Sequence, residues 1–213
     1  LTAVMMVPFS NSMAASLSDM PSGAYDLDLT HASVLWKVSH LGFSTYIGRF
    51  ENFDADLALD TSDFSKSSVD VEIQVDSLET AFPFPEKEDF NKKLSMEWFK
   101  GGEFPTINFV SKKVSALAED NTFTIEGDLT LMGNTHPVTL DAKLNGFTPS
   151  HPFKKVPLIG FSAVTTIDRT VWGLSNYAPN IGADVKVEIE GEFTMEAKLS
   201  LIHISEPTRH VDI

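Results

Sequence analysis

Hydrophobic and polar residues alternate along most of this chain with a period of two, the pattern of β-strands that bury one face. The alternation is clearest over residues 69–76, where four aliphatic side chains are interleaved with four polar ones. In the stretch 33–60, two alternating segments flank Gly42 and Gly48. Glycine suits a sharp bend or a close backbone approach. We therefore expect a strand, a glycine-marked corner and a second strand in this stretch.

Similar segments recur toward the C-terminus, and the turn Met132-Gly133-Asn134-Thr135 joins two of them into a hairpin. Further strands are expected at residues 25–29, 106–116, 122–131, 136–147, 160–167 and 185–195. About eight long antiparallel strands favour a closed barrel, because closure removes free sheet edges. The predicted fold is all-β, an eight-stranded antiparallel barrel that either holds one slim ligand or is filled by side chains.

The connection from Leu78 to Pro105 breaks the strand pattern. Residues 86–98 have a helical composition, and Phe90, Leu94 and Trp98 are spaced to share one helix face. We expect a short amphipathic helix across one barrel end, with its apolar face a plug or core contact in preference to a membrane anchor. Connections of this length tend to be lids or binding loops.

The two ends of the chain lie outside this pattern. Residues 1–9 are apolar but too few to cross a bilayer, and Ser12-Met13-Ala14 has the small-x-small pattern of a signal-peptidase site. We expect a truncated signal peptide over residues 1–14, hence a periplasmic or secreted protein, and an N-terminal arm over 15–24; a simple arm throughout is the alternative. Residues 197–213 resemble translated sequencing-adaptor sequence and are expected to be a non-native tail, unless they form a genuine C-terminal extension.

The composition favours a single barrel domain, expected over residues 25–196 of this 213-residue chain. The formal net charge of −14 disfavours nucleic acid, whose binding requires clustered Lys and Arg, and also docking on anionic lipid. The acidic residues of the strands alternate toward the outer face, where they are solvated. Because the chain has no cysteine, it has no disulfide, thiolate nucleophile or cysteine-based metal site.

Five segments, in order and with plausible spacing, resemble the YceI-like family. They are HLGFSTYIGRF (40–50), FPTINFVSKKV (104–114), GDLTLMGNTHPVTLDAKL (127–144), GFSAVTTIDRTVWGL (160–174) and IGADVKVEIEGEF (181–193). The resemblance implies a lipocalin-like barrel with a long apolar pocket, in a secreted or periplasmic protein that binds polyisoprenoid lipids, isoprenoid quinones or other long-chain amphiphiles. It also allows a homodimer, for which the sequence itself carries no signal. The chain departs from the family at Lys93, where a His usually precedes the Leu, so the pocket mouth is where its head-group preference is expected to differ.

The residues that could carry out chemistry do not form a catalytic or metal-binding pattern. The histidines at 31, 40, 136 and 151 lack zinc-like spacing, no G-x-S-x-G motif occurs, and most carboxylates alternate outward. We therefore expect no metal, no catalytic residue and no enzyme. His40 has inward parity, so it either bonds a polar group in the pocket or is a satisfied core histidine.

The expected ligand-binding residues are inward aromatic side chains and polar groups near a barrel mouth. They are Trp36, His40, Phe43, Thr45, Phe53, Phe109, Phe161, Arg169, Trp172 and Asn176. The aromatic residues either line a tunnel or fill a core. Arg169 either fixes a phosphate or quinone oxygen or pairs with Asp168 or Asp184 to brace its loop.

The predicted function is non-catalytic binding and carriage of a long-chain isoprenoid lipid, either a polyprenyl chain or an isoprenoid quinone. No cofactor is expected apart from this bound ligand. Neither nucleic-acid binding nor stable membrane insertion is expected. Two alternatives stay open: a lipid- or quinone-modifying enzyme of the same shape with His40 as acid/base, and a ligand-free interaction module.

Overall fold

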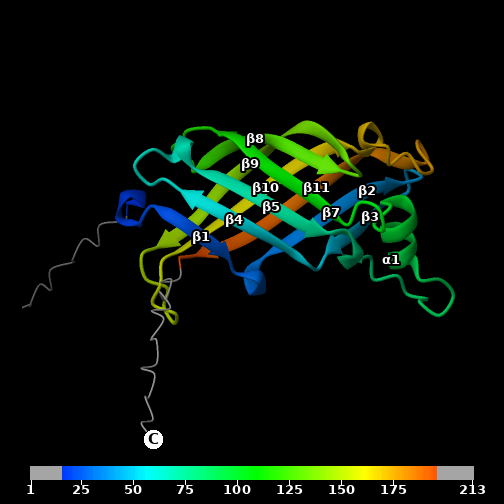
Figure 1. Cartoon of the computed structure of the whole chain (residues 1–213), viewed down its shortest axis with the longest axis horizontal. Helices are drawn as coiled ribbons and strands as arrows, with labels where there is room; N and C mark the ends of the chain where they lie inside the picture. The colour runs from blue at the N-terminus through cyan, green and yellow to red at the C-terminus, as the bar shows by residue number, and fades with distance from the viewer. Residues whose placement is uncertain (1–15, 196–213) are drawn as a thin grey trace, which may run out of the picture.

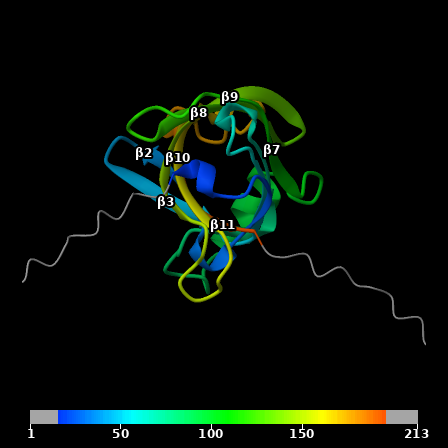
Figure 2. The same ribbon diagram turned by 90° about the vertical axis from the view of Figure 1, so that its left-hand side faces the viewer.

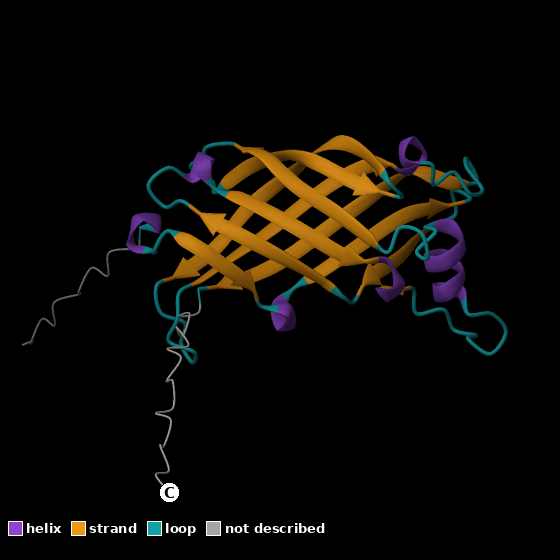
Figure 3. Ribbon diagram, in the orientation of Figure 1, coloured by secondary structure: helices purple, strands orange, loops and turns teal. Residues whose placement is uncertain are grey.

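The computed structural model describes residues 16–195, which form one β-barrel with a helix at one end (Figures 1 and 3). The strands are β1 (Gly23–Leu27), β2 (Ser33–His40), β3 (Ser44–Phe50), β4 (Phe53–Leu59), β5 (Ser68–Gln74), β6 (Leu78–Glu79), β7 (Thr106–Val114), β8 (Thr122–Leu131), β9 (Asn134–Thr148), β10 (Leu158–Asp168) and β11 (Ile181–Thr194). The predicted signal peptide and the predicted tail lie outside the described residues.

The barrel closes because β11 pairs with β10 along one edge and with both β1 and β2 along the other. All of these pairings are antiparallel, and β1 pairs with β4 while β2 pairs with β3. Three pairs of short strands, β1 with β2, β3 with β4, and β5 with β6, therefore each occupy one barrel position. Together with β7 to β11 they make the predicted eight-stranded antiparallel barrel, which is confirmed.

The glycine-marked corner predicted in the stretch 33–60 is present at Gly42, but β3, which was not predicted, occupies most of the segment between the two predicted strands. The chain turns at Leu41 and Gly42, both with positive φ, and β3 then runs back along β2. Gly48 lies inside β3 opposite Trp36, where a Cβ would lie less than 3.0 Å from three indole carbons. Gly48 thus serves the close approach of a side chain, not a bend.

The predicted helix is present but starts at Phe90, four residues later than expected. The Asp89 side chain accepts a hydrogen bond from the Lys92 amide, which caps α1 (Phe90–Lys92). The helix continues as a π-helix over Lys93–Trp98, in which the Phe99 amide bonds the Leu94 carbonyl at 3.0 Å. It lies across one end of the barrel (Figure 1), here called the helix end.

The opposite end is covered by the first described residues, in front of the barrel interior in Figure 2. Met20 and Tyr25 are buried there, and the Tyr25 hydroxyl donates to the Pro21 carbonyl at 2.7 Å. The described part of the predicted arm thus packs against the barrel through Leu17 and Met20. Among the described residues, no helix has the length and apolar character needed to cross a membrane.

Candidate ligand-binding cavity

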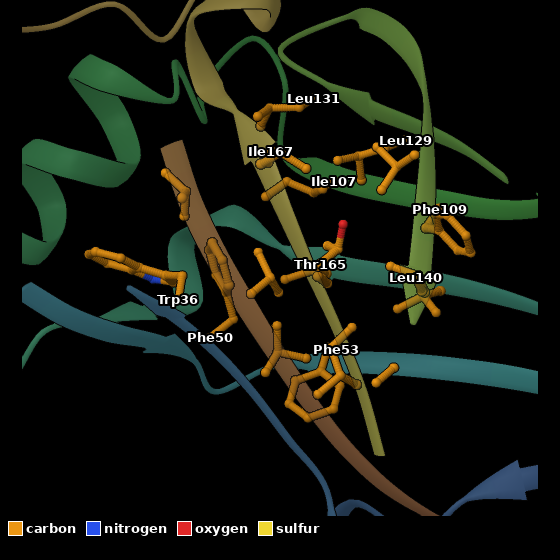
Figure 4. A pocket seen from close by; sticks show the side chains of 18 of the residues that line it. Trp36, Phe50, Phe53, Ile107, Phe109, Leu129, Leu131, Leu140, Thr165 and Ile167 are labelled. Atoms are coloured by element: carbon orange, nitrogen blue, oxygen red, sulfur yellow. The ribbon is translucent and has the colours of Figure 1, made fainter. Parts of the chain in front are cut away.

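The barrel encloses a cavity of about 760 Å³. Its walls are the inward residues of the alternating strands, among them Phe53, Ile107, Phe109, Leu129 and Leu140, which come from four different strands (Figure 4). Thr165 also faces it, but the Thr165 hydroxyl donates to the Thr139 carbonyl at 2.9 Å. The volume falls within the range of about 300–1,000 Å³ typical of small-molecule sites. The barrel is therefore hollow and apolar inside, not packed solid.

The cavity reaches the surface at the helix end. Four exposed residues line it there, on the turn between β2 and β3 and on the loop before β11: His40, Leu41, Tyr177 and Asn180. The Leu41 amide donates to the Asn180 carbonyl at 2.7 Å, so the turn and the loop are joined. Two other exposed lining residues, Ser68 and Glu190, lie on strands toward the opposite end. We call the opening at the helix end the mouth.

The helix supplies the apolar side of the mouth. Phe90, Leu94 and Trp98 all line the cavity, as the shared helix face predicted. Phe90 packs edge-on against Tyr46 with ring centroids 6.1 Å apart, and Trp98 lies 5.4 Å from Tyr177. Aromatic pairs at such separations stabilise their contact beyond simple area burial. The helix thus closes over the cavity through ring contacts to β3 and to the loop before β11.

Lys93 places a cation at this mouth. Its Nζ donates to the Glu88 carboxylate, and this hydrogen bond raises the pKa of Lys93. Lys93 lines the cavity, so a charged group lies at the mouth beside the aromatic rings of the helix.

Arg169 holds the loop at the mouth in place. The side chain is only 3% exposed, and its guanidinium donates to the carbonyls of four residues: Leu174, Asn176 (3.0 Å), Ile181 (2.8 Å) and Gly182 (2.8 Å). Burial lowers the pKa of Arg169 from its usual value, while the nearby Asp168 charge opposes that shift. The loop-bracing alternative is therefore the one observed, with carbonyl oxygens as the partners; no ion pair joins Arg169 to Asp168 or Asp184 within the described chain.

Comparison with known proteins agrees with this architecture. The model of the YceI-like domain matches residues 25–193. The chain belongs to the YceI-like family.

Related sequences include UPF0312 proteins from two genera. One from Vibrio vulnificus strain YJ016 is 32% identical over 195 residues, covering 90% of this chain and 94% of the relative. One from Pseudomonas putida strain F1 is 31% identical over 168 residues, covering 78% and 83%.

Three solved structures share the fold of this YceI-like chain. BcnA of Burkholderia cenocepacia has a TM-score of 0.68 at 19% identity, covering 78% of this chain and 99% of BcnA. The YceI protein of Campylobacter jejuni has a TM-score of 0.64 at 24% identity, with 75% and 90% covered. A polyisoprenoid binding domain from Saccharophagus degradans has a TM-score of 0.55 at 14% identity, with 81% and 98% covered.

Six of the ten residues predicted for the site line the cavity of this YceI-like barrel. They are Trp36, His40, Phe53, Phe109, Phe161 and Arg169. His40 lies at the mouth and is exposed, so it is not a core histidine. The Trp36 indole stacks on Tyr46 with ring centroids 6.2 Å apart, and its buried Nε1 has no hydrogen-bond partner among residues 16–195.

The other four predicted residues do not line the cavity. The expected inward orientation of Phe43 is wrong: its side chain is 91% exposed in the turn between β2 and β3. Thr45 also faces out, because β3 directs Tyr46 and Phe50 inward. Asn176 is exposed and contributes only its carbonyl to Arg169.

Trp172 is buried outside the cavity. Its Nε1 donates to the Leu129 carbonyl at 3.1 Å, and its ring packs edge-on against His136 at 5.0 Å. It fixes the turn after β10 to β8 and β9.

Sequence reasoning missed two functional candidates at the mouth, Tyr46 and Tyr177, and pointed to Lys93 only through its departure from the family pattern. Tyr46 belongs to the strand that was interpreted as a corner. Lys93 neighbours Leu94 in the predicted helix, and Tyr177 sits in a loop without periodicity. Within residues 16–195, no group of three or more His, Asp or Glu side chains is placed to hold a metal ion.

Proposed function

We propose that this protein binds and carries a long-chain isoprenoid lipid, either a polyprenyl chain or an isoprenoid quinone, without chemically changing it. The observation that carries the proposal is the apolar cavity of about 760 Å³ inside a closed barrel. The polyisoprenoid binding domain of Saccharophagus degradans, which shares this fold, supports the choice of ligand class.

The physical basis of affinity is removal of a hydrocarbon chain from water. Each buried CH₂ group contributes about 0.8 kcal/mol, so chain length dominates the free energy of binding. The few polar groups at the mouth, His40, Tyr46 and Lys93, would orient the polar head. We further propose that the protein works in the periplasm or outside the cell, on the basis of the apolar segment 1–9 and the Ser12-Met13-Ala14 pattern that follows it.

The test is to purify the full chain under native conditions, extract it with organic solvent and identify bound lipid by mass spectrometry. A stripped sample is then titrated with ubiquinone from dilute ethanol. We expect stoichiometric prenyl lipid or quinone in the extract and saturable uptake by the stripped protein. A clean extract together with no uptake would contradict the proposal.

A matched pair of variants on β10 locates the ligand. Ala163 lines the cavity, whereas Thr166 is exposed on the outer face of the same strand. Ala163→Trp should weaken uptake by occupying part of the cavity, and Thr166→Trp should leave it unchanged. Circular dichroism checks that both variants fold, because added core volume costs about 1–3 kcal/mol.

A further inference from the structure

Exposed hydrophobic side chains gather around the mouth. Of the eleven large hydrophobic residues exposed in the described part of the chain, six lie at the helix end: Leu41, Phe43, Phe84, Met96, Val171 and Tyr177. They come from the turn between β2 and β3, from the connection around the helix and from the loop before β11, all at the right of Figure 1. We call these six residues the apolar rim. Large exposed apolar side chains concentrated at one end of a protein are a feature of interaction sites.

Three of the four connections at the helix end also lack charge. The turn 41–43, the turn 132–133 and the loop 170–180 contain no Asp, Glu, Lys, Arg or His, although the whole chain has a net charge of −14. The loops at the opposite end, residues 60–67, 115–121 and 149–157, each carry ionisable side chains. The two ends of the barrel therefore differ in polarity, and only the end with the mouth has uncharged loops.

The helix connection completes this face with a nearly balanced charge. Residues 80–105 carry four lysines and five acidic residues. The Lys87 ammonium lies 4.2 Å from the ring centroid of Phe84, so this charge makes a cation–π contact with an exposed aromatic ring.

We propose that the apolar rim docks on the surface of a zwitterionic lipid bilayer and that the ligand enters and leaves the cavity there. This inference rests on the proposed function, since an isoprenoid chain is dissolved in bilayers and not in water. With the mouth against the bilayer, the chain passes from lipid to cavity without crossing water. Three uncharged loops and a nearly balanced helix connection lower the cost of desolvating ions at the interface.

The charge of the barrel determines the lipid class. Because the body of the protein is strongly acidic, an anionic surface repels it and a zwitterionic surface does not. Binding is therefore expected to weaken as anionic lipid is added to phosphatidylcholine vesicles, and salt should partly restore it by screening.

Two phenylalanines of nearly equal exposure provide a matched test. Phe43 in the apolar rim is 91% exposed, and Phe153 at the opposite end is 88% exposed. Co-sedimentation with phosphatidylcholine vesicles is measured for the full chain, Phe43→Ser and Phe153→Ser. Removing one buried apolar side chain from the interface should weaken vesicle binding about tenfold in Phe43→Ser. Phe153→Ser should bind vesicles as strongly as the parent. The chain ends are the same in all three proteins, so any vesicle binding by the ends contributes equally to each.

Transfer kinetics separate this proposal from the function on which it rests. Phe43→Ser should extract ubiquinone from vesicles more slowly than the parent, yet take it up normally from dilute ethanol. Vesicle binding without any quinone uptake would contradict the carrier function and leave docking standing. Normal uptake from ethanol without vesicle binding, or an equal loss in Phe153→Ser, overturns docking. A dimer by light scattering that Phe43→Ser alone dissociates would instead assign the rim to a second copy of this chain.

Discussion

Trp36 packs its indole directly over Gly48 on the neighbouring strand. The two residues are paired in the β2–β3 ladder, and a Cβ on Gly48 would lie less than 3.0 Å from three carbons of the ring. The ring itself lines the cavity and stacks on Tyr46, so one glycine determines how far a large aromatic side chain projects into the cavity.

Gly48→Ala should therefore displace the indole and destabilise the barrel. Overpacking of this kind costs about 1–3 kcal/mol of unfolding free energy, which urea unfolding measures. Gly146→Ala on β9 is the control, because a Cβ there has nothing within 4 Å. Equal stability of Gly48→Ala and the parent would show that the indole moves without cost.

The strands could be predicted from the sequence because each strand has one face toward the barrel interior and one toward solvent, so apolar and polar residues alternate with a period of two. The prediction at 122–131 coincides with β8, and the others differ by a few residues. β3 was missed because its inward positions include a glycine, Gly48, while the outward Ile47 is apolar and exposed. The alternation that identified the other strands is thus absent from β3.

Some of the residues that line the cavity could be predicted from the sequence. The free volume of the cavity and the position of its mouth could not. An inward Phe has the same pattern whether it fills a core or faces a cavity, so Phe53 and Phe109 fit both interpretations. Tyr177 reaches the mouth because Arg169 holds the surrounding loop through carbonyl groups far along the chain. Such backbone contacts leave no pattern in the side-chain sequence.

Arg169→Lys should destabilise the protein, because one ammonium cannot serve four carbonyls in different directions. Leaving buried carbonyls without partners costs about 1–3 kcal/mol each, so we expect a loss of at least about 2 kcal/mol in urea unfolding. Arg49→Lys is the control, since Arg49 is exposed and, within the described residues, its ion pair is with Glu51. A variant as stable as the parent would mean that the four hydrogen bonds contribute little.

Asp28 should make stability depend on acid pH. The Lys154 ammonium at 2.8 Å, followed by the Thr30 hydroxyl, holds the pKa of Asp28 well below its usual value of 3.8. The ionised form therefore favours folding. This stabilisation is complete above the unfolded pKa and is lost as the pH falls through the folded pKa.

Asp28→Asn should accordingly be less stable than the parent at about pH 7, and the difference should shrink toward about pH 3 and below. Lys154→Met removes the largest cause of the lowered Asp28 pKa. In a Lys154→Met background, Asp28→Asn should therefore cost less unfolding free energy over the same pH range. Urea unfolding at each pH gives the comparison. A difference that is constant with pH would assign the effect of Asp28→Asn to packing.

Asn91 joins the start of the helix to β6 and should control how fast ligand leaves. Its Oδ1 accepts from the Thr80 amide at 3.0 Å and from the Thr80 hydroxyl at 2.6 Å, and its Nδ2 donates to Glu79 at 2.8 Å. Each hydrogen bond contributes about 0.5–1.5 kcal/mol, so losing three would favour states in which the helix has moved off the mouth. Such local opening exposes the cavity without unfolding the barrel.

Asn91→Ala should release bound ubiquinone at least about tenfold faster than the parent, since a change of about 1.4 kcal/mol in the opening equilibrium is a factor of ten. Hydrogen exchange should speed up over residues 90–98 and stay unchanged in β8 and β9. Asn145→Ala is the matched control, because Asn145 is exposed on β9 and bonds only Ser162. Faster exchange at the helix with an unchanged release rate would show that ligand leaves by another route, the opposite end of the barrel being the one to examine.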